Sequence, residues 1–313
     1  QKTAYEIRLS LVGSEMCIRD RPSSNHRDAA PSSKHRDGFA ELSAQDQPNM
    51  ARRAALFQGV KLAAEYAGMR PLRHTLHLDP STAPPGAKVI YLLRHGEGVH
   101  NVAQREWRSR AAYDGRSEPY TVDNDPDFGY VDAELTEVGA KQAEALRPRF
   151  ARLEEPLDLI VTSPMRRATQ TALYALDHIW IAKIPVVAHE DCHETGGRHT
   201  CDKRLPRTAL EKYFPPYDNL EGEPYKSRVD YAQLESEEDP LWHPEKREGK
   251  RAICKRAARF AAWLGQRPEK RVAVAAHSGF LLALFNAVLD LPDDARGWFG
   301  TGECRAVALT FAT

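Results

Sequence analysis

Residues 91–101, YLLRHGEGVHN, place reactive side chains directly after a short apolar run. Arg94 and His95 are adjacent at the end of that run, and His100 and Asn101 follow after two glycines. A guanidinium group binds phosphoryl oxygens through parallel hydrogen bonds, and a neutral imidazole can attack phosphorus. Because neighbouring guanidinium groups lower the pKa of a histidine, His95 is expected to be neutral near pH 7.

Three further polar clusters follow apolar runs in the same way. They are Ser163–Thr171 with two adjacent arginines, the acidic His189–Glu194, and His277–Gly279. In a parallel sheet, ligands collect at the carboxyl ends of the strands. Four such strands would deliver arginines, histidines and a carboxylate to one edge. That set suits a dianionic phosphoryl group.

Apolar strands and amphipathic helices alternate from Lys88 onward. The predicted strands are Val89–Leu93, Leu157–Thr162, Ile184–Ala188 and Val272–Ala276, with a closing strand at Ala306–Phe311. Between them, Thr136 is the expected N-cap of one helix, and helical spacing recurs in Ala168–Ile179 and Ile253–Leu264. The pattern predicts an α/β fold, a three-layer sandwich whose mainly parallel sheet has helices on both faces.

Composition limits the partners. The 44 basic and 44 acidic residues among 313 cancel, which argues against nucleic acid or an anionic membrane as a partner. The most apolar stretch, Val272–Leu291, is long enough to span a bilayer, but it contains His277 and Asn286 and is predicted to be a strand followed by a helix. The five cysteines are an odd number, and no secretory signal pattern is visible, so a reducing, cytoplasmic location is expected.

Residues 1–50 differ from the rest. The sequence SSNHRD at 23–28 recurs as SSKHRD at 32–37 in a polar setting, which predicts disorder. Residues 4–21 also resemble translated adaptor sequence, so this tail is disordered or non-native, with Met50 as the expected start. Residues 51–313 are predicted to form one domain.

Three motifs together resemble the histidine phosphatase superfamily, also called phosphoglycerate mutase-like. They are Arg94-His95-Gly96 followed by Asn101, Ser163-Pro164 followed by Arg167-Ala168 and Thr171, and His277-Ser278-Gly279. The resemblance covers Lys88–Thr313 and is closest to the plant-type phosphoglycerate mutase-like proteins, through blocks at 98–101, 192–204 and 235–242. It implies the fold predicted above.

The resemblance also implies roles for individual residues. His95 would become the phosphohistidine, and Glu194 would protonate the leaving group as general acid. Arg94, Arg167 and His277 would surround the phosphate, and Asn101 would contact it. His277 would also take part in catalysis. The scheme requires no metal and no cofactor.

Several assignments have rivals. Arg166 competes with its neighbour Arg167, and Glu190 and Asp191 compete with Glu194. A zinc site would need Cys192, His193, His199 and Cys201, but their spacing does not follow the usual ligand pattern. The acidic run Ser236–Asp239 is expected to be a solvated turn, and Glu303 and Arg305 a structural pair.

The sequence therefore predicts a phosphatase that hydrolyses a phosphomonoester, with a phosphorylated small molecule as its substrate. The alternatives are a phosphomutase of the phosphoglycerate mutase type and a non-catalytic protein that binds a phosphorylated ligand. The insert Thr195–Lys250 is expected to cover the pocket. Its sequence indicates neither the phosphomonoester nor the oligomeric state.

Overall fold

The computed structural model describes residues 74–180, 184–214, 229–290 and 296–311, all within the unit 45–313. The predicted tail 1–50 and the expected start at Met50 lie outside the described residues. The one-domain prediction for residues 51–313 stays a prediction.

Within the described residues, eight strands form one sheet in the order β5-β4-β3-β6-β2-β8-β1-β7. The four strands predicted to carry the polar clusters are neighbours in it: β2 (Lys88–Arg94), β3 (Leu159–Thr162), β4 (Val186–His189) and β6 (Arg271–Ala276). These strands and β5 (Val229–Gln233) pair in parallel, whereas the closing strand β8 (Cys304–Thr310) is antiparallel to β2. The mainly parallel sheet is confirmed, and each predicted strand lies within two residues of its expected bounds.

Three strands were not predicted: β1 (His74–His77), β5 and β7 (Leu289–Asp290). β5 and β7 lie at the two edges of the sheet, and β1 lies beside β7. They are short or carry polar residues, so their own sequences give little strand signal. Their strand conformation depends on the neighbour with which each one pairs.

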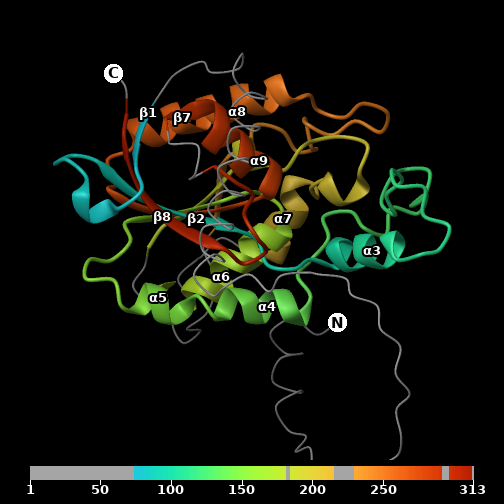
Figure 1. The fold of residues 1–313 in the computed structure, drawn as a ribbon, viewed down its shortest axis with the longest axis horizontal. Coiled ribbons are helices and arrows are strands. Elements are labelled where there is room, and N and C mark those ends of the chain that lie inside the picture. Colours follow the sequence, from blue (N-terminus) through green and yellow to red (C-terminus); the bar gives the residue numbers. More distant parts are fainter. Residues whose placement is uncertain (1–73, 181–183, 215–228, 291–295, 312–313) are drawn as a thin grey trace, which may run out of the picture. The chain divides into compact units, whose positions relative to one another are not determined.

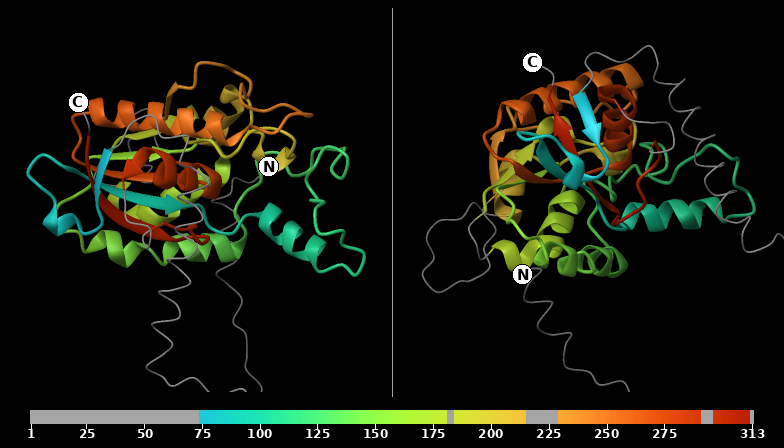
Figure 2. Two further views of the ribbon diagram at one scale, coloured as in Figure 1. Left: turned by 45° about the horizontal axis from the view of Figure 1, so that its top comes forward. Right: turned by 60° about the vertical axis from the view of Figure 1, so that its left-hand side comes forward.

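Helices cover both faces of the sheet (Figures 1 and 2). One face packs against α5 (Arg147–Ala151), α6 (Arg166–Trp180) and α7 (Arg207–Tyr213), and α4 (Glu137–Glu144) packs on α6. The other face packs against α8 (Lys250–Gln266), α9 (Ser278–Ala283) and η5 (Leu284–Val288). The predicted three-layer sandwich is confirmed.

Strand alternation divides the core between the two faces. Ile90 and Leu92 of β2 pack in the cluster with α8 and α9, whereas Tyr91 and Leu93 pack in the cluster with α6. A strand places successive side chains on opposite faces, so a strand that is apolar throughout requires cover on both sides. β2 meets this requirement and ends where Arg94 and His95 begin to project polar groups.

Two helices, α3 (Val99–Arg108) and α4, begin close to the carboxyl ends of the strands. Thr136, the predicted N-cap, accepts a hydrogen bond from the backbone N–H of Gly139 over 3.1 Å and opens α4. The helix α3, which was not predicted, follows β2 directly. In the apolar stretch that begins at Val272, β6 is followed by helix, as expected, and then by the short strand β7, which was not expected. Among the described residues, no helix is long and apolar enough to cross a membrane.

Candidate active site

The four predicted polar clusters lie along one edge of the sheet. The backbone N–H of His95 donates to Ala276 of β6 over 3.0 Å, and that of Ser163 donates to Ala275 over 2.9 Å. β4 pairs with β3 up to the register of Thr162 with Ala188. Since β4, β3, β6 and β2 are parallel neighbours, the loops that follow them meet at their common carboxyl edge.

His95 is buried at this edge with a defined ring orientation. Its Nδ1 lies 2.7 Å from the carbonyl oxygen of Gly96, so Nδ1 carries the proton and Nε2 the lone pair. The ring centroid lies 5.0 Å from that of His277 and 5.6 Å from that of His100. Burial, and then the positive charge of Arg167, hold the pKa of His95 well below its usual value. The neutral, nucleophilic form is therefore favoured.

Close backbone packing fixes the loop that carries His95. The N–H of Gly96 donates to Thr171 Oγ1 over 3.0 Å, and that hydroxyl donates to the carbonyl of Arg167 over 2.7 Å. A Cβ at Gly96 would overlap the carbonyl of Gly139 at the start of α4. This position therefore requires glycine, which allows α4 to press directly against the loop.

Arg167 and Arg94 supply positive charge to the same edge. Arg167 is fully buried and donates to Asp202 Oδ1 over 3.1 Å and to the carbonyl of Cys201 over 2.7 Å. Arg94 donates to the carbonyl of Phe299 over 2.7 Å. These partners hold the two guanidinium groups in place and reduce the cost of burying their charge.

Arg166 makes contacts with different residues from those that Arg167 contacts. Its guanidinium donates to the Asp132 carbonyl over 2.9 Å and to Glu134 over 2.5 Å, and it lies over the ring of Tyr213. Of the two competing arginines, Arg167 is therefore the one that lies beside His95.

His277 follows β6 and is fully buried. Its Nε2 lies 2.8 Å from the hydroxyl of Ser163, which also accepts from the N–H of Met165. The hydroxyl keeps its hydrogen and a second lone pair, so it can donate to Nε2 or accept from it. Where the hydroxyl donates to Nε2, the proton of neutral His277 lies on Nδ1. Burial and nearby Arg167 keep the pKa of His277 well below its usual value.

Four buried nitrogens around His95 lack a hydrogen-bond partner in the part of the chain that the structure describes. They are Arg94 Nε, Arg167 Nε, His100 Nδ1 and His277 Nδ1. Buried polar atoms normally have partners, and a concentration of exceptions indicates a ligand site. An anion would satisfy the two guanidinium N–H groups, and also either histidine nitrogen that carries a proton.

Glu194 reaches the same edge from the loop after β4. Its carboxylate accepts from the N–H of Thr195 over 2.8 Å, from the hydroxyl of Ser278 over 3.2 Å and from the N–H of Gly279 over 3.3 Å. A Cβ at Gly279 would overlap the carboxylate, so any larger residue there would force the carboxylate to move. Glu194 is thereby held beside the residues that follow His277.

The two rival carboxylates are held elsewhere by ion pairs. Both oxygens of Glu190 accept from the guanidinium of Arg204, at 2.9 to 3.1 Å. Asp191 pairs with exposed Arg259 at 2.5 Å. Glu194 is thus the acid of this loop that contacts the His277 segment.

Asn101 has a structural contact. Its Oδ1 accepts from the N–H of Gly98 over 2.9 Å and caps the start of α3. The proposed contact between Asn101 and phosphate stays a prediction.

The residues weighed for zinc do not gather in one place. Cys192 packs in the core cluster with α8, whereas Cys201 belongs to a separate cluster with Tyr120. His193 lies instead with Glu190 and Asp239, three potential ligands with donor atoms within 4.8 Å of one another. The guanidinium of Arg204 occupies the oxygens of Glu190 there, so we interpret this group as an ion-pair network.

The expectation for the acidic run Ser236–Asp239 was wrong in part. Asp239 is buried, accepts from His193 Nε2 over 3.0 Å and accepts from the N–H of Arg204 over 2.9 Å. The run wraps around the Arg204 guanidinium, to which Ser236, Glu237 and Glu238 present carbonyl oxygens. A solvated turn and a turn closed over a buried arginine have the same acidic composition. The expected pair of Glu303 and Arg305 is confirmed at 2.6 Å.

Sequence reasoning missed four residues that surround the site. His100 lies beside the His95 ring, Ser163 binds His277, and Asp202 joins Arg167 to Arg247. His100, Ser163 and Asp202 lie inside the motif blocks that carried the resemblance, and that position was the available signal. Arg247 lies in the insert Thr195–Lys250 and has no such signal.

Comparisons with known proteins find a family match and several relatives. The family model of the histidine phosphatase superfamily (branch 1) matches residues 124–313. Phosphoglycerate mutase-like protein 1 of Arabidopsis thaliana is 29% identical, over 71% of this chain and 81% of its own length. A phosphoglycerate mutase-like protein of the same plant is 31% identical, over 64% of this chain and 74% of its own. Glucosyl-3-phosphoglycerate phosphatase of Mycobacterium tuberculosis is 26% identical, over 66% and 77%.

The family match spans more than half of the chain, and its relatives carry both mutase-like and phosphatase names. This chain belongs to the histidine phosphatase superfamily.

Proposed function

We propose that the protein is a phosphatase that hydrolyses a phosphorylated small molecule through a phosphohistidine on His95. The observation that carries the proposal is the bond from His95 Nδ1 to the Gly96 carbonyl, which leaves Nε2 as the nucleophile at the cationic edge. Burial beside Arg167 keeps that ring neutral. The phosphatase named among the relatives supports hydrolysis.

In the first step, His95 Nε2 forms a bond to phosphorus while the bond from phosphorus to the ester oxygen breaks. Arg94, Arg167 and His277 hold the phosphoryl oxygens, and Asn101 contributes a further contact. Glu194, as the general acid, gives a proton to the leaving oxygen. In the second step, Glu194 takes a proton from water as the water attacks phosphorus and frees His95.

No step of this scheme calls for a metal or a cofactor. A mutase would return the phosphoryl group from His95 to the substrate instead of to water. A non-catalytic protein would bind the phosphate and leave His95 unmodified. Measurement of the products separates the three functions, because only the phosphatase releases inorganic phosphate as its main product.

The test is rapid quenching of the enzyme during turnover of a ³²P-labelled ester. We expect an acid-labile, base-stable label on the wild type, release of inorganic phosphate, and no label on His95→Ala. Equal labelling of His95→Ala would contradict the proposal. Labelled protein that returns phosphate to a second hydroxyl of the substrate would identify a mutase.

A further inference from the structure

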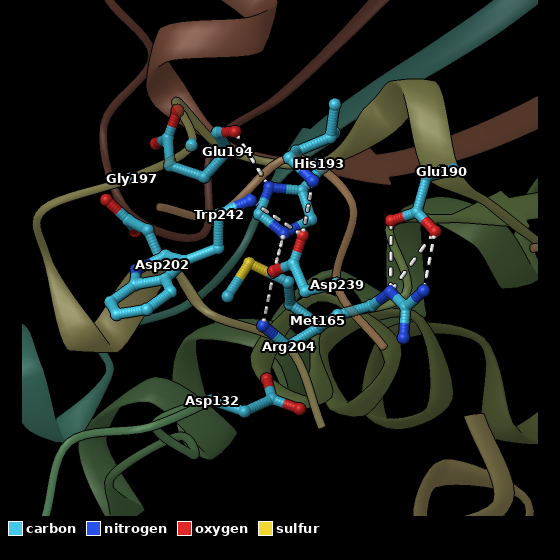
Figure 3. Close-up of polar contacts among 12 residues, drawn as sticks. Asp132, Met165, Glu190, His193, Glu194, Gly197, Asp202, Arg204, Asp239 and Trp242 are labelled. Carbon is cyan, nitrogen blue, oxygen red and sulfur yellow. Dashed lines mark hydrogen bonds and ion pairs between the residues drawn. The ribbon is translucent and has the colours of Figure 1, made fainter. Parts of the chain in front are cut away.

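His193, the residue before Glu194, has hydrogen-bond acceptors at both ring nitrogens. Nδ1 lies 2.8 Å from the carbonyl oxygen of Glu194, and Nε2 lies 3.0 Å from Asp239 Oδ2 (Figure 3). A neutral imidazole has one N–H and one lone pair. One of the two oxygens would therefore face a lone pair unless the ring carries both protons.

The charges around the fully buried ring of His193 also favour the doubly protonated form. The groups that face it from the elements packed around it are Asp239, Glu190, Glu248, Arg256, Arg204 and neutral His277. Three carboxylates and two guanidinium groups leave one negative charge, which a cationic His193 balances. Burial lowers the pKa of His193, but the Asp239 carboxylate overcomes that effect and raises it to about 9.

The guanidinium of Arg256 also binds the backbone around Glu194. Arg256 donates to the carbonyl of His193 over 3.0 Å and to that of Glu194 over 3.1 Å. Glu248 accepts from Arg256 over 2.7 Å and from the N–H of Gly196 over 3.0 Å. The Glu194 carbonyl thus receives one bond from a permanent cation and one from a titratable group.

We propose that doubly protonated His193, anchored by Asp239, is a positioning residue that fixes the Glu194 carboxyl group for proton transfer. The inference rests on the proposed function of Glu194 as general acid. Loss of a proton from His193 would place a lone pair against the Glu194 carbonyl or against Asp239 and loosen the loop. His193 then contributes an alkaline limit to reactions that need the acid.

The test uses Asp239→Asn, which keeps the size and one acceptor oxygen of the side chain but removes its charge. His193 should then lose its second proton at lower pH. For an alkyl phosphate, which needs the acid, the alkaline fall of kcat should begin at lower pH, with a loss of about tenfold per pH unit. For an aryl phosphate with a stable phenolate product, kcat should change little. Glu238→Gln removes the neighbouring exposed carboxylate and should leave both profiles unchanged.

An unchanged pH profile of Asp239→Asn would overturn the inference, and so would an equal loss for both esters at every pH, which is the sign of a purely structural role. ¹⁵N-histidine NMR of the wild type gives a second measurement that does not depend on how the variant folds. Both His193 nitrogens should be protonated at pH 7.5, and a neutral ring would also overturn the inference. Failure of the phosphatase proposal would be seen in a different experiment. In the labelling test, His95 of the wild-type enzyme would then carry no phosphate.

Discussion

The backbone N–H of His95 donates to the carbonyl oxygen of Ala276, the residue directly before His277. The parallel pairing of β2 with β6, which this bond extends, places two histidines that are far apart in sequence with their ring centroids 5.0 Å apart. One ring presents a lone pair at Nε2, and the other presents an unpartnered Nδ1 among the described residues. In the tautomer that carries its proton on Nδ1, His277 can donate to a phosphoryl oxygen while His95 attacks phosphorus.

The first prediction concerns Glu194. Glu194→Gln should slow an alkyl phosphate by roughly 10²–10⁴-fold, because the poor leaving group needs a proton. An aryl phosphate should lose far less. Steady-state kcat on both esters measures the difference, after burst kinetics have established that formation of the phosphohistidine limits the rate. Asp191→Asn, which removes a carboxylate that pairs with exposed Arg259, is the control. Equal slowing of both esters by Glu194→Gln would move the acid to another residue.

The second prediction separates the adjacent arginines. Arg167→Ala should lower kcat/KM by roughly 10²–10³-fold for alkyl and aryl phosphates alike, because a guanidinium that holds phosphoryl oxygens acts whatever alcohol departs. Arg166→Ala removes the same charge from contacts with Asp132 and Glu134 and should chiefly reduce thermal stability. The reverse ranking in kcat/KM would show that Arg166 is the phosphate ligand.

The third prediction tests the approach of Glu194 to the start of α9. Gly279→Ala places a methyl group where the Glu194 carboxylate lies, so the carboxylate must shift. Misplacement of a catalytic group can cost up to roughly 10²-fold, and the loss should again be larger for the alkyl ester. The control is Gly249→Ala, since a Cβ at Gly249 meets no atom within 4 Å. Wild-type kcat of Gly279→Ala on the alkyl ester would argue against the proposed position of the acid.

The fourth prediction follows from the lowered pKa values of His95 and His277, which burial causes first and Arg167 reinforces. Both rings stay neutral in the folded protein at pH values where the unfolded chain, with a histidine pKa of about 6.5, binds protons. The unfolded state then binds more protons, so stability falls as pH drops below about 6.5. Urea midpoints at pH 7 and pH 5 should show this decline, and His277→Gln should show a smaller one. ¹⁵N-histidine spectra that show a cationic His95 at pH 6 would refute the premise.

The sequence by itself determined the strands that carry the site and the order of their motifs. β2, β3, β4 and β6 are continuous apolar runs, which only a doubly covered strand can bury, and each ends in a polar cluster. Parallel pairing then requires those clusters to share one edge. For this reason the meeting of Arg94, His95 and His277 could be predicted before the structure was known.

Only the tertiary structure decided between neighbours with the same chemistry. Arg166 and Arg167 are identical side chains one position apart, and the direction of α6 sends Arg167 to Asp202 and Arg166 to Glu134. Asp239 belongs to an acidic run that is typical of solvent-exposed turns, yet it is buried because the chain closes over Arg204 and His193. Composition and spacing report what a side chain can do. The partner that it meets depends on contacts between segments far apart in the sequence, and those form only when the chain packs.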